Sequence, residues 1–280
     1  MLDINILCVG IIRNGASCLH RSVTTIDKAF SFTTKKQWLI IESDSDDNTV
    51  DLLDSLKNEI PNFFFSSMGS LKERMPHRTE RIAFCRNQYL QHVFENPRFA
   101  EVEYVVMADL DGVNDGLNWQ AALSCWTRTD WDACFANQSG AYYDVWALRH
   151  PIWSPNDCWQ QAAFLSHFGM NDDYARLVSV ASRMMEIPST SQWIPVTSAF
   201  GGLGIYKKNI LKDLQFRGLG SSGAPECEWV SFNEHLCHKG YKLFINPQMI
   251  NGGFNEHSAI YKTALQQMHA TRAKELEVSE

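Results

Sequence analysis

The chain has 280 residues, a length that suits a single α/β domain with insertions. Hydrophobic residues make up 45% and charged residues 20%, an ordinary globular composition that excludes a disordered or fibrous chain. The formal net charge of -7 argues against a general nucleic-acid-binding protein, because such a protein carries a basic face.

The cysteines and the N-terminus bear on the compartment. No two of the 8 cysteines have the Cys-x-x-Cys spacing of a structural zinc site. The N-terminus lacks a basic region, and no stretch reaches the ~20 apolar residues of a membrane helix. We therefore expect a reduced, cytoplasmic protein without a transmembrane segment. Peripheral association with a membrane-bound assembly at the inner face of the membrane stays open.

Short apolar runs bounded by polar residues predict buried parallel strands at residues 4–12, 37–41 and 104–108. Helical patterns alternate with them at residues 18–31, 49–59 and 78–94. This β-α-β-α order predicts a doubly wound sheet whose ligand crevice lies at the carboxyl ends of the strands.

The second half of the chain gives fewer patterns. Residues 218–225 are a glycine-rich loop that we expect to be mobile, and a helix is expected at residues 229–239. No internal repeat or low-complexity linker is present in the sequence, which favours a single domain. Residues 262–280 are predicted to form a polar C-terminal helix or tail.

The strongest signal for chemistry is the pair Asp109 and Asp111, which follows the third predicted strand. With one residue between them, both carboxylates project to the same side if the strand geometry continues. Two adjacent carboxylates are costly unless a cation neutralises them, and oxygen ligands suit Mn²⁺ or Mg²⁺. We predict a metal site; the alternative is a pair of turn or helix-capping aspartates before Gly112.

An acidic run, residues 42–47, follows the second predicted strand. In a functional interpretation, Glu42 or Asp44 accepts hydrogen bonds from the base or ribose hydroxyls of a nucleotide. In a structural interpretation, the run is a solvated loop in which one of residues 47–49 caps the next helix. The two roles can coexist on different residues.

Two further pairs of polar residues are donor-binding candidates. Arg13 and Asn14 end the first predicted strand, where the ligand crevice is expected. Arg86 and Asn87 lie in the third predicted helix, and an arginine can bind a carboxylate or phosphate through its planar fork. Most surface arginines have no such role.

The sequence resembles GT-A glycosyltransferases and, more specifically, the fungal capsule-associated α-1,3-mannosyltransferase family. The matches are collinear over about residues 5–255. They comprise residues 9–14 (Val-Gly-Ile-Ile-Arg-Asn), the loop at 42–49, Arg86-Asn87, Asp109-Leu110-Asp111, Trp131-Asp132-Ala133-Cys134, Tyr143-Asp144-Val145-Trp146 to Arg149, and Pro225-Glu226-Cys227-Glu228-Trp229 through Gly240 to Asn246-Pro247. The chain departs from the family at residues 198–202, where Ser-Ala-Phe-Gly-Gly replaces Cys-Trp-Asn-Gly. The family is membrane-anchored, whereas we expect no anchor here.

The resemblance implies a GT-A (Rossmann-like) fold, with a mixed, mainly parallel sheet flanked by helices. It implies one glycosyltransferase domain at residues 1–261, with a nucleotide-binding half at 1–115 and an acceptor half at 116–261. The implied metal ligands are Asp109, Asp111 and His257, the last because GT-A enzymes often add a histidine near the end of the domain. A lone histidine is more often structural.

Three carboxylates are candidates for catalysis. Glu226 and Glu228 offer a base for the acceptor hydroxyl or a partner for sugar hydroxyls, although one of them can instead cap the following helix. Asp144 lies between Tyr143 and Trp146, and aromatic rings beside a carboxylate suit sugar recognition, although such rings are more often core.

Gly201 and Gly202 allow either close approach of a ligand to the backbone or tight packing. Gly201 and Gly202 are therefore further donor-binding candidates.

The favoured function is a metal-dependent glycosyltransferase that uses a nucleotide-diphosphate sugar. The resemblance suggests GDP-mannose, a retaining reaction and a glycan acceptor in capsule, lipopolysaccharide or another cell-surface polysaccharide. A sugar nucleotidyltransferase is the second hypothesis, but it calls for a glycine-rich basic loop that residues 11–16 match poorly. A non-catalytic glycan-binding protein on the same fold is the third.

Overall fold

The sheet begins with β1 (Leu2–Ile12), an apolar strand that lies between two other strands. Leu7 and Val9 of β1 enter one core cluster, whereas Ile6 and Cys8 enter a second cluster on the opposite face. Side chains alternate across a strand, so an apolar run of this kind is buried on both faces. Helices must therefore cover both sides of the sheet.

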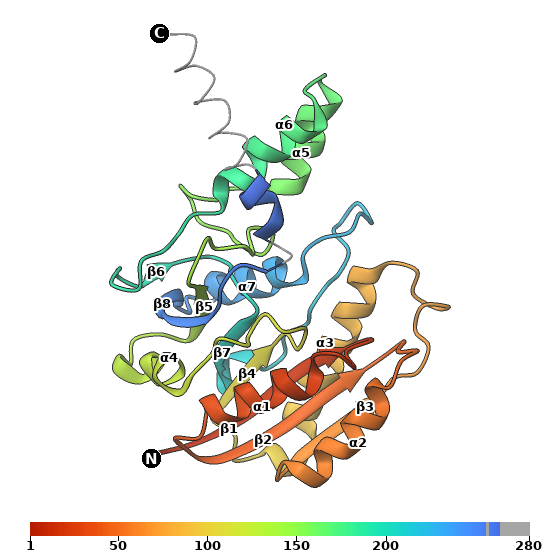
Figure 1. Cartoon of the computed structure of the whole chain (residues 1–280), viewed down its shortest axis with the longest axis vertical. Coiled ribbons are helices and arrows are strands. Elements are labelled where there is room, and N and C mark those ends of the chain that lie inside the picture. Colours follow the sequence, from red (N-terminus) through yellow and green to blue (C-terminus); the bar gives the residue numbers. More distant parts are fainter. Residues whose placement is uncertain (256–257, 264–280) are drawn as a thin grey trace.

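The structure is a computed structural model that describes residues 1–255 and 258–263 (Figure 1). The remaining strands are β2 (Thr33–Glu42), β3 (Phe63–Ser67), β4 (Tyr104–Ala108), β5 (Ala133–Gln138), β6 (Ile194–Pro195), β7 (Leu203–Lys207) and β8 (Leu243–Gly252). The α-helices are α1 (Leu19–Ala29), α2 (Thr49–Glu59), α3 (Arg78–Glu95), α4 (Trp119–Leu123), α5 (Cys158–His167), α6 (Asp172–Ser179) and α7 (Glu228–His238). Short 3-10 helices are η1 (Pro97–Phe99), η2 (Ser124–Thr127), η3 (Ala181–Arg183) and η4 (Lys208–Leu211).

The strands form one sheet in the order β3-β2-β1-β4-β7-β5-β8-β6. β1 pairs in parallel with β2 and β4, and β2 pairs in parallel with β3. β7 runs antiparallel between β4 and β5, and the short β6 runs antiparallel to β8. The prediction of a mixed, mainly parallel sheet in a single domain is confirmed.

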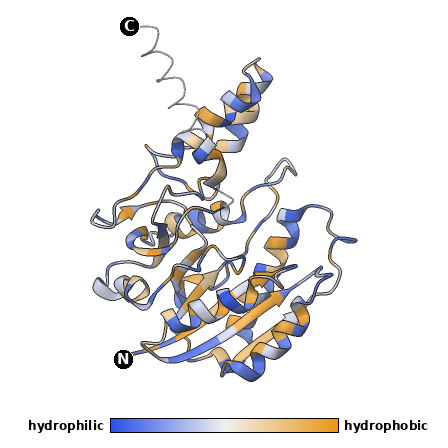
Figure 2. Ribbon diagram, in the orientation of Figure 1, coloured by the Kyte–Doolittle hydropathy of each residue, from blue (hydrophilic) through white to orange (hydrophobic). Residues whose placement is uncertain are grey.

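Helices cover the two faces of the sheet as separate layers. Side chains of α1, α2 and α4 join the core on one face, and side chains of α3 and α7 join the core on the other. Figure 2 shows hydrophobic residues concentrated along the strands between these layers. The α5–α6 hairpin projects away from the sheet, at the top of Figure 1.

The predicted elements of the first half are confirmed with small shifts in their ends. α2 and β4 have the predicted bounds, whereas α1 is shorter than predicted and β1 starts two residues earlier. One expectation was wrong: Glu42 belongs to β2 instead of the loop that follows. It stays in the strand because it pairs with Ser67 of β3, a strand that the sequence analysis did not predict.

Two other expectations concern the cysteines and the chain ends. All 8 cysteines are described and unpaired. Within residues 1–255 and 258–263, no helix has the length and apolar character needed to cross a bilayer. Residues 264–280 of the predicted tail lie outside the described residues.

Candidate active site

A crevice with a volume of about 870 Å³ lies at the carboxyl ends of β1, β2 and β4, where the doubly wound pattern predicts it. Most of the predicted site residues line it: Arg13, Asn14, Asp44, Arg86, Asp109, Asp111, Tyr143, Asp144, Trp146 and Glu228. Five do not: Glu42, Asn87, Gly201, Gly202 and Glu226. His257 lies outside the described residues.

Arg86 on α3 lies between two carboxylates that are far apart in the sequence. Its Nη2 is 3.2 Å from Oδ1 of Asp109, and its Nε is 3.0 Å from Oε1 of Glu228. The side chains of Arg86 and Glu228 are only 4% and 8% exposed, so solvent screens this pair little. Arg86 therefore fixes the end of β4 relative to the start of α7.

Aromatic rings complete the surroundings of Arg86. The centre of its guanidinium lies 4.3 Å from the ring of Trp229, a distance suited to a cation–π contact. Phe200 stacks on the same indole at 3.8 Å between ring centroids. Trp229 and Phe200 were not predicted as site residues, although Trp229 directly follows Glu228 and Phe200 lies in the segment 198–202 that departs from the family.

Negative charge accumulates around Asp109, at the end of β4. Burial raises the pKa of the Asp109 carboxyl to about 7, and Arg86 only partly offsets the rise. Three further carboxylates add to it: Asp111, Asp144 and Glu228. The side chain is still 31% exposed, so a ligand in the crevice can reach it. A cation placed here would relieve the unfavourable charge.

The residues at this end of the crevice fit a divalent cation that is only partly held by protein. Asp109 and Asp111 supply the hard oxygen ligands that Mn²⁺ and Mg²⁺ prefer. Over the described ranges, no group of three or more His, Cys, Asp or Glu side chains is arranged to hold an ion. An ion that takes two carboxylates and completes its shell with water and substrate phosphate matches this donor set.

Two backbone N–H groups hold Asp144 in place, one of them just before β7. The N–H of Gly201 donates to Oδ2 of Asp144 at 2.9 Å, and the N–H of Ala147 donates to Oδ1 at 3.4 Å. Gly202 has φ +84°, and a Cβ on it would lie 2.7 Å from the Tyr143 hydroxyl oxygen. Glycine is thus required here for the backbone conformation and for the packing of Tyr143.

Hydrogen bonds connect the loop after β1 with the loop after β2. Oδ1 of Asp44 accepts hydrogen bonds from the N–H groups of Leu71 (2.7 Å) and Lys72 (2.9 Å), and Arg81 lies 3.6 Å from Oδ2. Oδ1 of Asn14 accepts from the N–H of Asp46 at 2.9 Å. Asp44 thus lines the crevice and also orders the loop around it.

Besides Asp44, two further residues of the acidic run have structural partners. The carboxylate of Glu42 accepts from the Ser45 N–H at 3.0 Å and from the Ser67 hydroxyl. Asp47 accepts from the N–H of Thr49 at 3.0 Å at the start of α2. The N-cap of α2 is Asn48, whose side chain makes no capping hydrogen bond, and Asp47 orders the start of the helix from the residue before it.

Asn87 and Glu226 do not line the crevice. The amide of Asn87 donates to the carbonyl of Phe216 at 3.0 Å and accepts from its N–H at 2.8 Å. Glu226 lies just after the loop at residues 218–225, and its N–H donates to the carbonyl of Gly218 at 3.1 Å. Glu228, two residues later, is the member of this pair that reaches the crevice.

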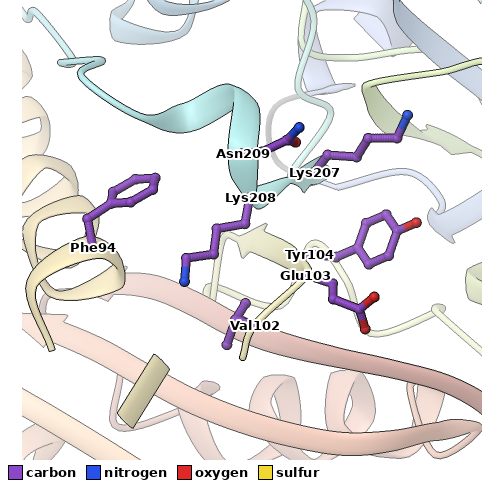
Figure 3. A pocket seen from close by; sticks show the side chains of 7 residues that line it. All are labelled: Phe94, Val102, Glu103, Tyr104, Lys207, Lys208 and Asn209. Carbon is purple, nitrogen blue, oxygen red and sulfur yellow. The ribbon is translucent and has the colours of Figure 1, made fainter. Parts of the chain in front are cut away.

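A second cavity of about 430 Å³ lies at the other end of the sheet, beside the start of β4 and the end of β7 (Figure 3). The amino group of Lys208 there donates to the carbonyls of Phe99 (2.6 Å) and Ala100 (3.0 Å). Its charge is thus bound to the backbone, and the cavity has no cluster of carboxylates like that of the crevice.

No protein-family model matches the sequence, and a comparison with curated proteins finds no match. Solved structures are similar in fold. One is the mannosyltransferase PcManGT from Pyrobaculum calidifontis in complex with GDP-Man and Mn²⁺, with a TM-score of 0.53 at 13% identity. Another is S. aureus TarS 1-349 in complex with UDP-GlcNAc, with a TM-score of 0.51 at 13% identity.

Each likeness covers 90% of this chain, which spans 57% of the PcManGT chain and 59% of the TarS chain. At this level of identity the likeness concerns the fold. The chain has the GT-A, Rossmann-like fold of these glycosyltransferases.

Proposed function

We propose that the chain is a metal-dependent glycosyltransferase that moves a sugar from a nucleotide-diphosphate donor to a glycan acceptor. The observation that carries the proposal is the placement of Asp109 and Asp111 at the carboxyl end of β4, inside the crevice of a GT-A fold. The raised pKa of Asp109 supports it, because that carboxylate lacks sufficient positive charge nearby.

Asp109 and Asp111 would hold Mn²⁺ or Mg²⁺ together with the donor diphosphate. The bound ion would neutralise the leaving nucleoside diphosphate as a Lewis acid. Arg86 keeps Asp109 in position through their ion pair, and Glu228 in turn positions Arg86. Arg13, Asn14 and Asp44 line the same crevice at the ends of β1 and β2, where we place the nucleotide.

Asp144 is our candidate for the base that accepts the proton of the acceptor hydroxyl. It lines the crevice and is oriented by the Gly201 N–H, whereas Glu228 serves Arg86 and Glu226 lies outside the lining. Direct displacement with Asp144 as base would invert the anomeric centre. The stereochemistry of the product therefore separates this role from the retention that the family resemblance implies.

We take the proposed donor and acceptor from the family resemblance. GDP-mannose is the donor that the capsule-associated mannosyltransferase family suggests, and PcManGT is itself described with GDP-Man. TarS is described with UDP-GlcNAc, so uridine donors belong in the same screen. A growing capsule, lipopolysaccharide or other cell-surface polysaccharide is the proposed acceptor, reached from the cytoplasmic side.

The test is a thermal-shift screen of UDP, GDP and their sugar conjugates, with and without Mn²⁺. A ligand at about 100 times its Kd stabilises the folded state by about 2.7 kcal/mol. We expect one nucleotide to raise the Tm only with Mn²⁺, and we expect Asp111→Ala to lose that shift. Asp130→Ala is the matched control, since Asp130 forms a surface ion pair with Arg128 away from the crevice.

Each other outcome points to a different function. A shift with nucleoside triphosphates plus sugar phosphates, instead of diphosphate sugars, would favour the nucleotidyltransferase. No shift with any nucleotide would contradict the transferase and favour the glycan-binding protein.

A further inference from the structure

The crevice has an aromatic side to which the structure adds Trp159, a residue that the sequence did not single out. Trp159, the second residue of α5, lines the crevice together with Trp146 and is 43% exposed. The described part of the chain offers its indole no hydrogen bond and no ring contact. Large apolar surface left open inside a polar crevice is a feature of ligand-binding sites.

A buried carboxylate, Asp157, holds this aromatic side in place. Its Oδ2 accepts from Nε1 of Trp146 at 2.9 Å and from Nη2 of Arg149 at 3.3 Å. Its Oδ1 accepts from the backbone N–H groups of Trp159 and Gln160, both at 2.9 Å, and so caps α5. One oxygen of Asp157 thus holds the indole of Trp146, and the other holds the backbone from which Trp159 projects.

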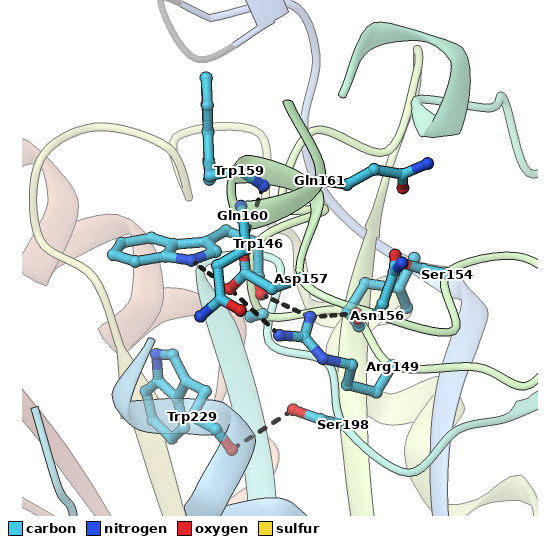
Figure 4. A network of polar contacts seen from close by, with 12 residues as sticks. Trp146, Arg149, Ser154, Asn156, Asp157, Trp159, Gln160, Gln161, Ser198 and Trp229 are labelled. Carbon is cyan, nitrogen blue, oxygen red and sulfur yellow. Dashed lines mark hydrogen bonds and ion pairs between the residues drawn. The ribbon is translucent and has the colours of Figure 1, made fainter. Parts of the chain in front are cut away.

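Arg149 supports Asp157 from the protein side. The side chains of Arg149 and Asp157 are each 9% exposed, and Arg149 also donates to the carbonyls of Trp146 (3.0 Å) and Leu148 (2.8 Å). In Figure 4, the two indoles lie on one side of Asp157 and Arg149 lies on the other. The indole of Trp146 and the start of α5 are thus fixed before any ligand arrives, which lowers the entropic cost of binding.

The chemistry around these rings suits a sugar ring. A pyranose has an apolar C–H face, which can lie on an indole, and hydroxyl groups, which donate to carboxylates. The crevice supplies both, because Trp146 and Trp159 line it together with Asp144 and Glu228. The nucleotide-binding residues that we propose, Arg13 among them, come from residues 1–115, whereas all four of these residues come from residues 116–261.

We propose that Trp159 and Trp146 form the subsite for the acceptor pyranose, and that Asp157 is its positioning residue. The inference rests on the proposed transferase function and deepens it, since it names the acceptor as a glycan recognised through a sugar face. It assigns the α5–α6 hairpin a role in acceptor choice.

Fluorine NMR of the full chain labelled with fluorotryptophan tests the subsite without knowledge of the natural acceptor. The chain has 9 tryptophans, and Trp→Phe variants assign the resonances of Trp146, Trp159 and Trp119. The probes are methyl α-D-mannopyranoside, methyl α-D-glucopyranoside and the methyl β-glycoside of N-acetylglucosamine, each with Mn²⁺ and UDP or GDP. Trp119 is the matched control, because it is 50% exposed and does not line the crevice.

We expect at least one glycoside to shift the Trp159 and Trp146 resonances saturably and to leave Trp119 unchanged. Trp159→Ala should weaken that glycoside roughly tenfold or more when its binding is followed at Trp146, as for other buried aromatic anchors. Trp159→Phe should retain part of the affinity. The absence of a saturable shift at Trp159, or an unchanged glycoside affinity in Trp159→Ala, would overturn the proposal.

Asp157→Asn tests the positioning role. We expect the glycoside affinity to fall while the affinity for nucleotide and Mn²⁺ stays unchanged, a split that general destabilisation would not produce. An equal loss of both affinities would overturn the positioning role.

The same samples separate the two hypotheses. Nucleotide binding without any glycoside shift refutes the subsite alone, and glycoside binding without any nucleotide shift refutes the transferase.

Discussion

Residues 1–115 and residues 116–261 contribute to the crevice by different means. In the first half, parallel strands end at one edge of the sheet, so Arg13, Asp44 and Asp109 come together through topology. In the second half, Asp144 and Trp146 lie in an irregular segment after β5. Asp144 accepts a hydrogen bond from the N–H of Gly201, and Trp146 donates one to Asp157, the N-cap of α5. A side of the crevice formed by strand ends can be predicted from a local sequence pattern. A side held by hydrogen bonds between separate segments can be seen only in the folded chain.

The sharpest test of the second half is Asp144→Asn. If Asp144 is the base, the substitution should lower kcat for transfer by about 10²–10⁴-fold and leave nucleotide affinity intact. Glu226→Gln is its control and should leave kcat unchanged, because Glu226 does not line the crevice. An effect of Glu226→Gln as large as that of Asp144→Asn would place the catalytic carboxylate on the 218–225 loop side.

Arg86 joins the two halves, so its loss should affect the stability of both. Arg86→Met leaves Asp109 and Glu228 close together without their shared cation, and we expect the free energy of unfolding to fall by about 3–5 kcal/mol. Urea denaturation measures this. The control is Arg21→Met, whose exposed ion pair with Asp115 should contribute less than about 1 kcal/mol.

In the first half, we expect metal binding at Asp109 to depend on pH. The pKa of Asp109 is raised to about 7, so a proton competes with Mn²⁺ for the carboxylate below that value. The apparent affinity for Mn²⁺ should fall about tenfold from about pH 8 to about pH 6, as measured by calorimetry.

In the absence of metal, the stability of the folded state changes with pH in the opposite direction to the Mn²⁺ affinity. The folded state binds this proton more tightly than the unfolded state does, so the contribution of Asp109 to stability declines as pH rises toward 7. A Mn²⁺ affinity that does not change with pH would remove Asp109 from the ligand set.

The smallest expected effect concerns Asn87. Asn87→Ala removes both hydrogen bonds to Phe216, and we expect a loss of about 1–2 kcal/mol in unfolding free energy. The affinity for the donor nucleotide should stay unchanged. A donor affinity that falls without a loss of stability would instead support the donor-binding role that the family resemblance implied for Asn87.

The sequence predicted the first half well because its elements are periodic and their ends are polar. β4 and α2 have their predicted bounds, and the pair Asp109 and Asp111 lies where the strand pattern places it. β3 was missed because it is an edge strand that buries only Phe63, whereas β4, of the same length, is buried along almost its whole length. β7 was missed because its start is marked by glycines, which the sequence analysis related to ligand approach or packing instead of strand entry.

The second half could be predicted only in part. Tyr143, Asp144 and Trp146 line the crevice as expected, but the pattern gave no sign that Asp157 would orient Trp146 or place Trp159 beside it. These contacts depend on how residues 146–160 fold back on themselves. Contacts within such an irregular segment produce no hydrophobic periodicity in the sequence, so they cannot be predicted from it.

The position of β7 has a consequence for synthesis of the chain. β4 exposes one edge until β7, about a hundred residues later, arrives to pair with it. At ribosomal speeds of roughly 5–20 residues per second, that edge waits for several seconds in the nascent protein. An unpaired hydrophobic strand is a site of aggregation, so a fragment ending near residue 115 should be insoluble. Although the first half carries the proposed nucleotide-binding residues, we therefore expect that it does not fold as an independent module.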